Sequence, residues 1–291
     1  MSLSLLLFFF STASLLSPAL ARAATKVGAV DLPGGRRQHS YPTPRVGGLA
    51  VFLPLLFALG LLPSEAPNLP LALGMGGICL LGALDDLHSL GAAAKLVTQL
   101  LLLLFCVTLT YRDAPALFLF FALLFLLALT NGANFIDGAD ALLLSVSLPP
   151  LITLSLLGNG TLPLALIGLL LGVLPYNRPR ALLFLGDAGS TTLGFTMGYL
   201  ALLHVFPPDL SVFAPFSEDP LPYLRLGVLF GVFFLDLVST SLSRIASGTS
   251  PFRPDRTHVH HRLARAIGEK KTRILLVILS SILALVFYLS A

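Results

Sequence analysis

The sequence predicts an all-α polytopic integral membrane protein with about ten transmembrane helices. Of its 291 residues, 56% are hydrophobic and only 11% are charged, whereas a soluble domain carries about 25% charged residues. The mean hydropathy is +0.90. Ten apolar segments approach the roughly 20 residues that a spanning helix needs. We predict spans over residues 3–20, 46–62, 69–84, 94–110, 115–130, 141–158, 162–176, 189–206, 221–242 and 273–290.

The first predicted span has an alternative interpretation. Ala19-Leu20-Ala21 resembles a signal-peptidase site, which would make residues 1–24 a cleaved segment. No basic residue precedes the apolar run, as one does in a signal peptide, so we expect the segment to be retained. Because the remaining polar stretches are short, we predict one transmembrane domain over residues 1–291.

Basic residues are distributed unevenly between the two sides that ten spans create. Of the 18 Lys and Arg residues, all but Arg112 and Arg225 lie on one side, and the positive-inside rule makes that side cytoplasmic. This asymmetry explains the pI near 9.3 without a nucleic-acid partner, and it favours anionic membrane lipid and an anionic substrate. The predicted cytoplasmic connections are residues 21–45, 85–93, 131–140, 177–188 and 243–272.

Four short polar segments interrupt the apolar chain, over residues 84–87, 131–140, 186–190 and 256–261. Carboxylates and imidazoles are costly at a membrane boundary, so they indicate a function. A hydrophobic hairpin separates each segment from the next, which returns all four to the cytoplasmic side. Clustered carboxylates beside clustered histidines indicate a metal-dependent phosphate site.

Asp85 and Asp86 directly follow the third predicted span. Adjacent carboxylates repel each other unless a cation lies beside them, and Mg²⁺ takes oxygen ligands together with waters and substrate phosphates. Lys95 lies near enough in the sequence to face the same site. A solvated helix end without a ligand is an equally consistent interpretation of this doublet alone.

The run 131–140 is more specific. Asn131, Asn134, Asp137 and Asp140 place two carboxamides and two carboxylates within ten residues, a density of acceptors that is unusual in a plain loop. Its glycines allow tight turns. Asp140 has a second interpretation, because it lies where it could cap the sixth span.

Gly186-Asp187-Ala188-Gly189-Ser190 precedes the eighth predicted span. Free amides at a helix N-terminus suit a phosphate, and glycines permit close approach of the backbone. Phe184 is either a core residue or a surface on which a base stacks, and its chemistry alone favours the core.

Three histidines, His258, His260 and His261, share a connection with Arg256 and other arginines. Histidines at this density could bind zinc, but the arginines favour an anionic ligand because guanidinium groups suit phosphate oxygens. Asp236 lies inside the ninth predicted span. It is either functional or a buried partner for a nearby hydroxyl.

Together these segments resemble the polyprenyl-phosphate N-acetylhexosamine-1-phosphate transferases. The ordered set covers most of the chain and is far more specific than any single motif. The last segment is most similar to the undecaprenyl-phosphate alpha-N-acetylglucosaminyl 1-phosphate transferase branch. The motifs are Pro44-Arg45-Val46-Gly47-Gly48, Leu84-Asp85-Asp86, Asn131-x-x-Asn134-x-x-Asp137-Gly138-x-Asp140, Phe184-Leu185-Gly186-Asp187-Ala188-Gly189-Ser190 and Arg256-Thr257-His258-Val259-His260-His261.

The resemblance implies an enzyme of the bacterial inner membrane that acts on the cytoplasmic side. UDP-N-acetylhexosamine and undecaprenyl phosphate would give undecaprenyl-diphospho-sugar and UMP, as the first membrane step of cell-envelope glycan synthesis. Asp187 would hold Mg²⁺, with Mn²⁺ as an alternative, while Asp85, Asp86 and Asp137 would serve catalysis. The residues expected to bind substrate are Lys95, Asn131, Asn134, Asp140, Asn177, Phe184, Arg256, His258, His260 and His261.

Two departures from the family pattern leave the donor sugar open. Ala139 and Ala141 stand where the family commonly has Leu and Gly, so another UDP-N-acetyl-sugar, or UDP-MurNAc-pentapeptide, is an alternative donor. A membrane ion or anion transporter is the alternative outside the enzymes, but its polar residues should lie near the bilayer midplane. A homodimer is left open.

Overall fold

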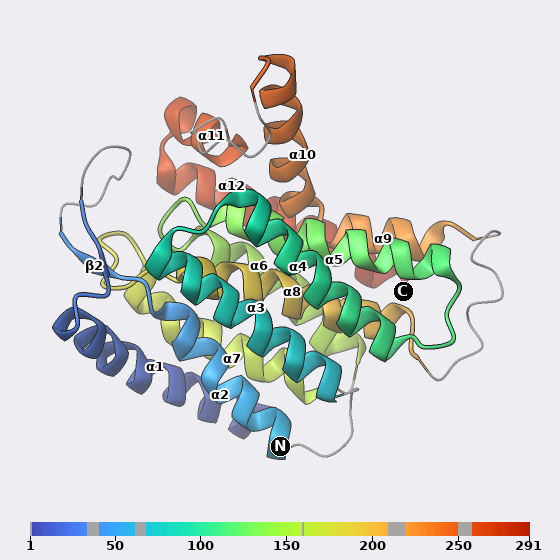
Figure 1. Cartoon of the computed structure of the whole chain (residues 1–291), viewed down its shortest axis with the longest axis horizontal. Coiled ribbons are helices and arrows are strands. Elements are labelled where there is room, and N and C mark those ends of the chain that lie inside the picture. Colours follow the sequence, from blue (N-terminus) through green and yellow to red (C-terminus); the bar gives the residue numbers. More distant parts are fainter. Residues whose placement is uncertain (1, 34–40, 62–67, 159, 209–218, 250–257) are drawn as a thin grey trace.

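The computed structural model describes residues 2–33, 41–61, 68–158, 160–208, 219–249 and 258–291. Figure 1 shows a bundle of helices with a small sheet at one end. The helices are α1 (Ser2–Lys26), α2 (Gly47–Leu61), α3 (Asn68–His88), α4 (Ala92–Thr110), α5 (Ala116–Ile136), α6 (Leu142–Leu157), α7 (Thr161–Asn177), α8 (Gly186–Val205), α9 (Leu221–Leu229), α10 (Gly231–Ala246), α11 (Val259–Ile267) and α12 (Glu269–Ser290). Strands β1 (Val30–Asp31) and β2 (Thr43–Pro44) pair antiparallel.

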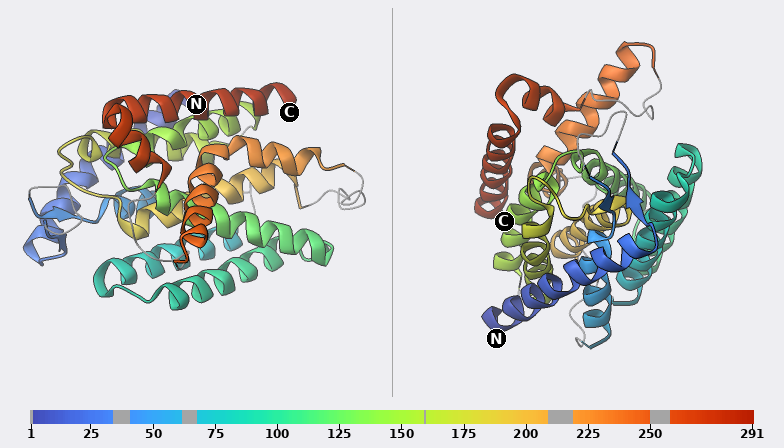
Figure 2. Two further views of the ribbon diagram at one scale, coloured as in Figure 1. Left: turned by 90° about the horizontal axis from the view of Figure 1, so that it is seen from above. Right: turned by 90° about the vertical axis from the view of Figure 1, so that its left-hand side faces the viewer.

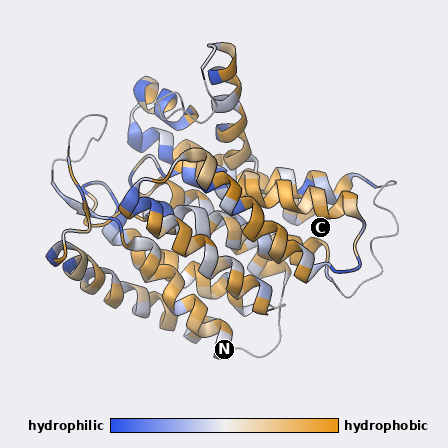
Figure 3. Cartoon of the chain, in the orientation of Figure 1, coloured by the Kyte–Doolittle hydropathy of each residue, from blue (hydrophilic) through white to orange (hydrophobic). Residues whose placement is uncertain are grey.

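The fold is that of a polytopic membrane protein, as the sequence predicts. Apolar residues cover the long helices, while hydrophilic residues gather mainly around the end that carries β2 and on α11 (Figure 3). In the described part of the chain, five helices are long and apolar enough to cross a membrane, or six if the bent pair α9–α10 is one span. The expected number of about ten crossings therefore stays a prediction, because α2, α6 and α7 have only 15 to 17 residues.

The ninth predicted span, over residues 221–242, is not one continuous helix. It breaks at Phe230 into α9 and α10, which meet at 83°, and Figures 1 and 2 show α10 leaving the bundle. A periodic apolar pattern does not reveal this bend, because the polar contacts that orient α10 come from residues far along the chain.

Helix α8 lies at the centre of the bundle and is buried along nearly its whole length. Small residues allow its neighbours to approach closely, as is common in membrane helix packing. A Cβ at Gly82 of α3 would lie 2.5 Å from the Ala188 Cα, and a Cβ at Gly48 of α2 would lie 2.4 Å from the Gly189 Cα. These two crossings bring α2 and α3 against the first turn of α8, where the polar segments meet.

Helix α1 packs along α7 in the same way. A Cβ at Gly172 would lie 2.5 Å from the carbonyl oxygen of Phe10, and one at Gly168 would lie 2.6 Å from that of Leu6. The Tyr176 hydroxyl donates to the Ser14 carbonyl at 2.9 Å. The first predicted span is therefore an integral part of the bundle described here.

Candidate active site

A cavity of about 1180 Å³ lies where the polar segments meet. Its wall brings together side chains that are far apart in the sequence. The prediction that the site lies on loops is only partly right, because Asp86, Asn134 and Asp187 lie in the end turns of α3, α5 and α8. Of the residues that the sequence assigns to the site, those on this wall are Asp86, Asn134, Asp137, Asp140, Asn177, Phe184, Asp187 and His261. Arg256 lies outside the described residues.

Lys95 joins one predicted catalytic carboxylate, Asp85, to the predicted metal ligand, Asp187. Its Nζ lies 3.0 Å from Asp85 Oδ2 and also contacts Asp187 Oδ2. Asn134 donates from Nδ2 to Asp187 Oδ1 at 3.0 Å and to Ser190 Oγ at 2.9 Å. Asp187 is thus held from both sides, with 28% of its side chain exposed, whereas Asp85 and Lys95 are not among the residues that line the cavity.

Asp86 has a different environment from its neighbour Asp85. Its carboxylate accepts the backbone N–H groups of Asp187 and Ala188, each at 3.1 Å, so a residue of α3 caps the N-terminus of α8. The sequence suggested that these amides are available for phosphate. The structure corrects this, because an internal carboxylate already occupies two of them at the positive end of the helix.

Arg45 is a cavity residue that the substrate-binding prediction omitted. Its Nη2 lies 2.7 Å from Asp31 Oδ1, and its Nη1 lies 3.3 Å from Asp86 Oδ1. The Pro44 carbonyl accepts the Phe184 N–H at 2.8 Å, which joins β2 to the segment before α8. The motif that contains Arg45 was noted in the sequence, but nothing there pairs it with Asp31 and Asp86.

Asp137 and Asp140 face the cavity from the turn after α5. Burial raises the pKa of Asp137 well above its usual range, and the negative charges of Asp187 and Asp86 raise it further. Burial also raises the pKa of Asp140. The alternative that Asp140 caps the next helix is wrong, because Ala141 is the N-cap residue of α6 and no side chain caps it.

Two predicted substrate-binding asparagines have hydrogen-bond partners within the protein. Asn177 accepts the Ala141 N–H at 3.1 Å and donates to the Leu183 carbonyl at 3.0 Å. It therefore stabilises Ala141, whose φ of 61° is costly for a residue with a side chain. Asn131 donates to Gln99 Oε1 and to the Leu127 carbonyl, both at 2.9 Å, away from the cavity.

Phe184 is half-buried on the cavity wall and not in the core that its chemistry favoured. Its backbone is fixed on both sides, because its carbonyl also accepts the Gly47 N–H at 2.9 Å. The Phe184 ring therefore shares the cavity wall with Arg45 and Arg180.

Comparison with known proteins decides the family. Residues 69–205 match glycosyl transferase family 4. The chain is 33% identical over 270 residues to the undecaprenyl-phosphate alpha-N-acetylglucosaminyl 1-phosphate transferase of Thermotoga maritima, covering 90% of this chain and 82% of that protein. The chain belongs to glycosyl transferase family 4.

Two further relatives extend this similarity. A Salmonella typhi protein with the same name is 29% identical over a match 306 residues long. The match covers 96% of this chain and 80% of the relative. The decaprenyl-phosphate N-acetylglucosaminephosphotransferase of Mycobacterium tuberculosis is 29% identical over a match 300 residues long. This match covers 88% of this chain and 73% of the relative. Membership of this family supports a phosphotransferase and not the transporter alternative.

The histidine segment of this family 4 protein is divided between the cavity and the protein interior. His261 lies on the cavity wall, whereas His258 and His260 are buried and lie beside Asp236. From the sequence, Asp236 was predicted to lie within the membrane, but only hydroxyl groups were considered as its buried partners.

Proposed function

We propose that this protein transfers N-acetylglucosamine-1-phosphate from UDP-GlcNAc to undecaprenyl phosphate and releases UMP. One structural observation supports this most strongly: polar residues from helix ends and connections far apart in the sequence line a single cavity beside apolar helices. The names of the family 4 relatives supply the acceptor and the sugar phosphate.

The residues of the cavity fit a Mg²⁺ ion. Asp187, Asp86 and Asp137 offer oxygen ligands, which are the kind that Mg²⁺ takes. Burial raises the pKa of Asp137 and the negative charges of Asp187 and Asp86 raise it further, and a divalent cation would offset that repulsion. We therefore assign Asp187 as the ligand of Mg²⁺, or of Mn²⁺ in its place. The bound ion would neutralise charge on the diphosphate.

The chain's own residues would position the two substrates. An oxygen of the lipid phosphate attacks the sugar-linked phosphorus, and the bond from that phosphorus to the oxygen of UMP breaks. Asp85 and Lys95, which are ion-paired at 3.0 Å, would orient the lipid phosphate. A phosphate monoester loses its second proton at a pH of about 6, so a strong base is not required, and positioning with charge stabilisation dominates. Phe184 would stack on the uracil.

The donor assay tests this function. We expect the purified protein in lipid nanodiscs to release UMP from UDP-GlcNAc only when undecaprenyl phosphate is present. UDP-MurNAc-pentapeptide should give little UMP. UDP-GalNAc and UDP-linked 6-deoxy N-acetyl sugars are tested in the same assay, because Ala139, which departs from the family pattern, lies on the cavity wall. Preference for the pentapeptide donor would contradict the sugar assignment, and no UMP from any donor would contradict the reaction.

We also propose that the cavity faces the cytoplasm from the bacterial inner membrane. In a variant whose Cys79 and Cys106 are replaced by Ala, a membrane-impermeant thiol reagent on intact cells should label Asp113→Cys but not Ser247→Cys. Both positions are accessible at the surface, and the charge asymmetry assigns them to opposite sides. Labelling of Ser247→Cys alone would reverse the orientation and move the active site outside.

A further inference from the structure

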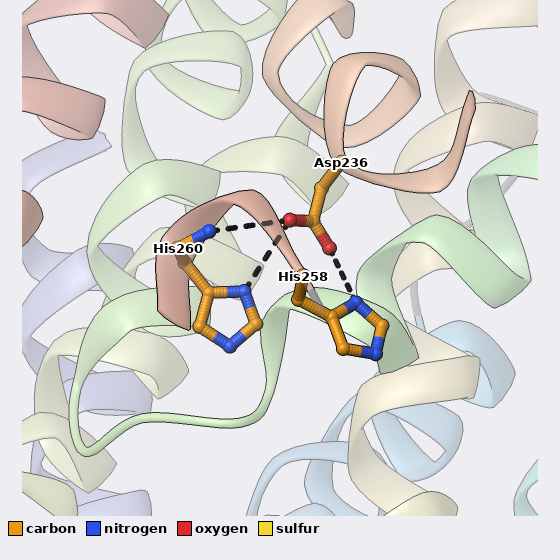
Figure 4. A group of neighbouring side chains, drawn as sticks. All are labelled: Asp236, His258 and His260. Atoms are coloured by element: carbon orange, nitrogen blue, oxygen red, sulfur yellow. Dashed lines mark hydrogen bonds and ion pairs between the residues drawn. The ribbon is translucent and has the colours of Figure 1, made fainter. Parts of the chain in front are cut away.

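A buried carboxylate on α10 holds the histidine segment. Asp236 Oδ2 lies 2.9 Å from His258 Nδ1, and Asp236 Oδ1 lies 3.4 Å from both His260 Nδ1 and the His260 backbone nitrogen (Figure 4). The exposed fractions of Asp236, His258 and His260 are 3%, 8% and 2%. A carboxylate buried to this degree needs such partners.

A neighbouring arginine fixes the proton on His258. Arg244 lies two turns beyond Asp236 on α10, and its Nη2 is 3.3 Å from His258 Nε2. A guanidinium group can only donate, so Nε2 is the acceptor and the ring proton resides on Nδ1. The Nδ1–H group then donates to Asp236. The hydrogen-bond network thereby assigns the tautomer.

The same proton assignment argues against a metal ion in this cluster. The potential ligand atoms of Asp236, His258 and His260 lie within 4.8 Å of one another, as in sites with two histidines and one carboxylate. A metal on Nδ1 of a neutral His258 would leave the proton on Nε2, facing the donors of Arg244. Ligating histidines instead donate that proton to an acceptor. The contacts therefore favour a hydrogen-bonded network.

Gly138 connects this network to the cavity. A Cβ at Gly138 would lie 2.6 Å from His260 Nε2 and 3.2 Å from His261 Nε2, so the turn between Asp137 and Asp140 packs directly on the imidazoles. The ring centroids of His260 and His261 are 4.2 Å apart. Gly138 and His261 both lie on the cavity wall.

We propose that Asp236 is a positioning residue for the donor site. It holds His258 and His260 against the turn at Gly138, and His261 is thereby presented to the cavity, where it would meet the diphosphate of the donor. The 83° bend between α9 and α10 brings Asp236 to this place. This inference rests on the proposed function, since it concerns the substrate of the same cavity.

A double-mutant cycle tests whether Asp236 acts through His261. Asp236→Asn and His261→Ala should each lower kcat/KM for UDP-GlcNAc by about 10- to 100-fold, the range for groups that orient a ligand. The double variant should be no worse than the more impaired single variant, because residues that act as a unit are not additive. Multiplicative losses would overturn the proposal.

Gly138→Ala provides a second variant in case Asp236→Asn does not fold. The added methyl should displace the imidazoles and lower kcat/KM, without further loss when it is combined with His261→Ala. Gly76→Ala is the matched control, because a Cβ at Gly76 meets nothing within 4 Å, and it should keep wild-type activity. Wild-type activity in Gly138→Ala would contradict the proposed packing.

The tautomer gives a readout that needs no substrate. Solid-state NMR of ¹⁵N-histidine-labelled protein in bilayers, assigned with His258→Gln, should show the His258 proton on Nδ1. A proton on Nε2, or a metal-bound signal, would overturn the network. If the wild type releases no UMP, the proposed function fails. If it is active but the cycle is multiplicative, only the role of Asp236 fails.

Discussion

Replacing Asp187 with Asn should lower the rate of UMP release by roughly 100- to 1000-fold, the range for removing one electrostatic contact to a developing charge. Asn keeps the size of the side chain but removes the charge that would hold the metal ion. Asn134 and Lys95 would keep their other partners, Ser190 and Asp85. We therefore expect turnover to fall much more than stability, and single-turnover UMP release measures the loss.

The matched control is Asp113→Asn. Asp113 is an exposed carboxylate in the connection between α4 and α5, so its variant should keep wild-type turnover. A chelator should abolish UMP release by the wild-type protein, and added Mg²⁺ should restore it. Turnover within a few fold of wild type in Asp187→Asn, or full activity with chelator, would contradict the metal assignment.

The sequence predicted the helices and much of the cavity wall for a simple reason. Apolar runs near the length of a span must form helices in a bilayer, and an even number of them between polar segments returns each segment to the same side. The expectation that distant polar side chains lie together agrees with the structure, because Asn134, Asp137, Asp187 and His261, from three predicted connections, share one cavity.

The tertiary partners of individual side chains could not be predicted. Asp85 and Asp86 are adjacent in sequence, yet Asp85 pairs with Lys95 whereas Asp86 lines the cavity and caps α8. Their difference arises from the close approach of α3 to α8 at Gly82. The break between α9 and α10 could not be predicted from the local sequence either, since Asp236 contacts histidines that lie more than 20 residues away.

Asp86→Asn should destabilise the protein, whereas Asp85→Asn should chiefly impair turnover. An asparagine at position 86 replaces one acceptor oxygen with an NH₂ group, which would face an N–H group of Asp187 or Ala188. A buried donor left without an acceptor costs about 1–3 kcal/mol. Because those residues form the first turn of α8, the same change should displace Asp187 and lower turnover as well.

Thermal unfolding separates these two roles. Cys79 and Cys106 are free and buried, so a thiol-reactive dye reports the midpoint of unfolding for each variant. We expect a lower midpoint for Asp86→Asn and a midpoint near wild type for Asp85→Asn, with UMP release reduced in both. An asparagine at position 85 keeps an oxygen that accepts the Leu90 N–H, and Lys95 keeps a second carboxylate, Asp187. At position 86 both carboxylate oxygens accept amides of α8, so one amide loses its acceptor. Equal midpoints with equal losses of turnover would instead place both carboxylates in the chemical step and remove the capping role of Asp86.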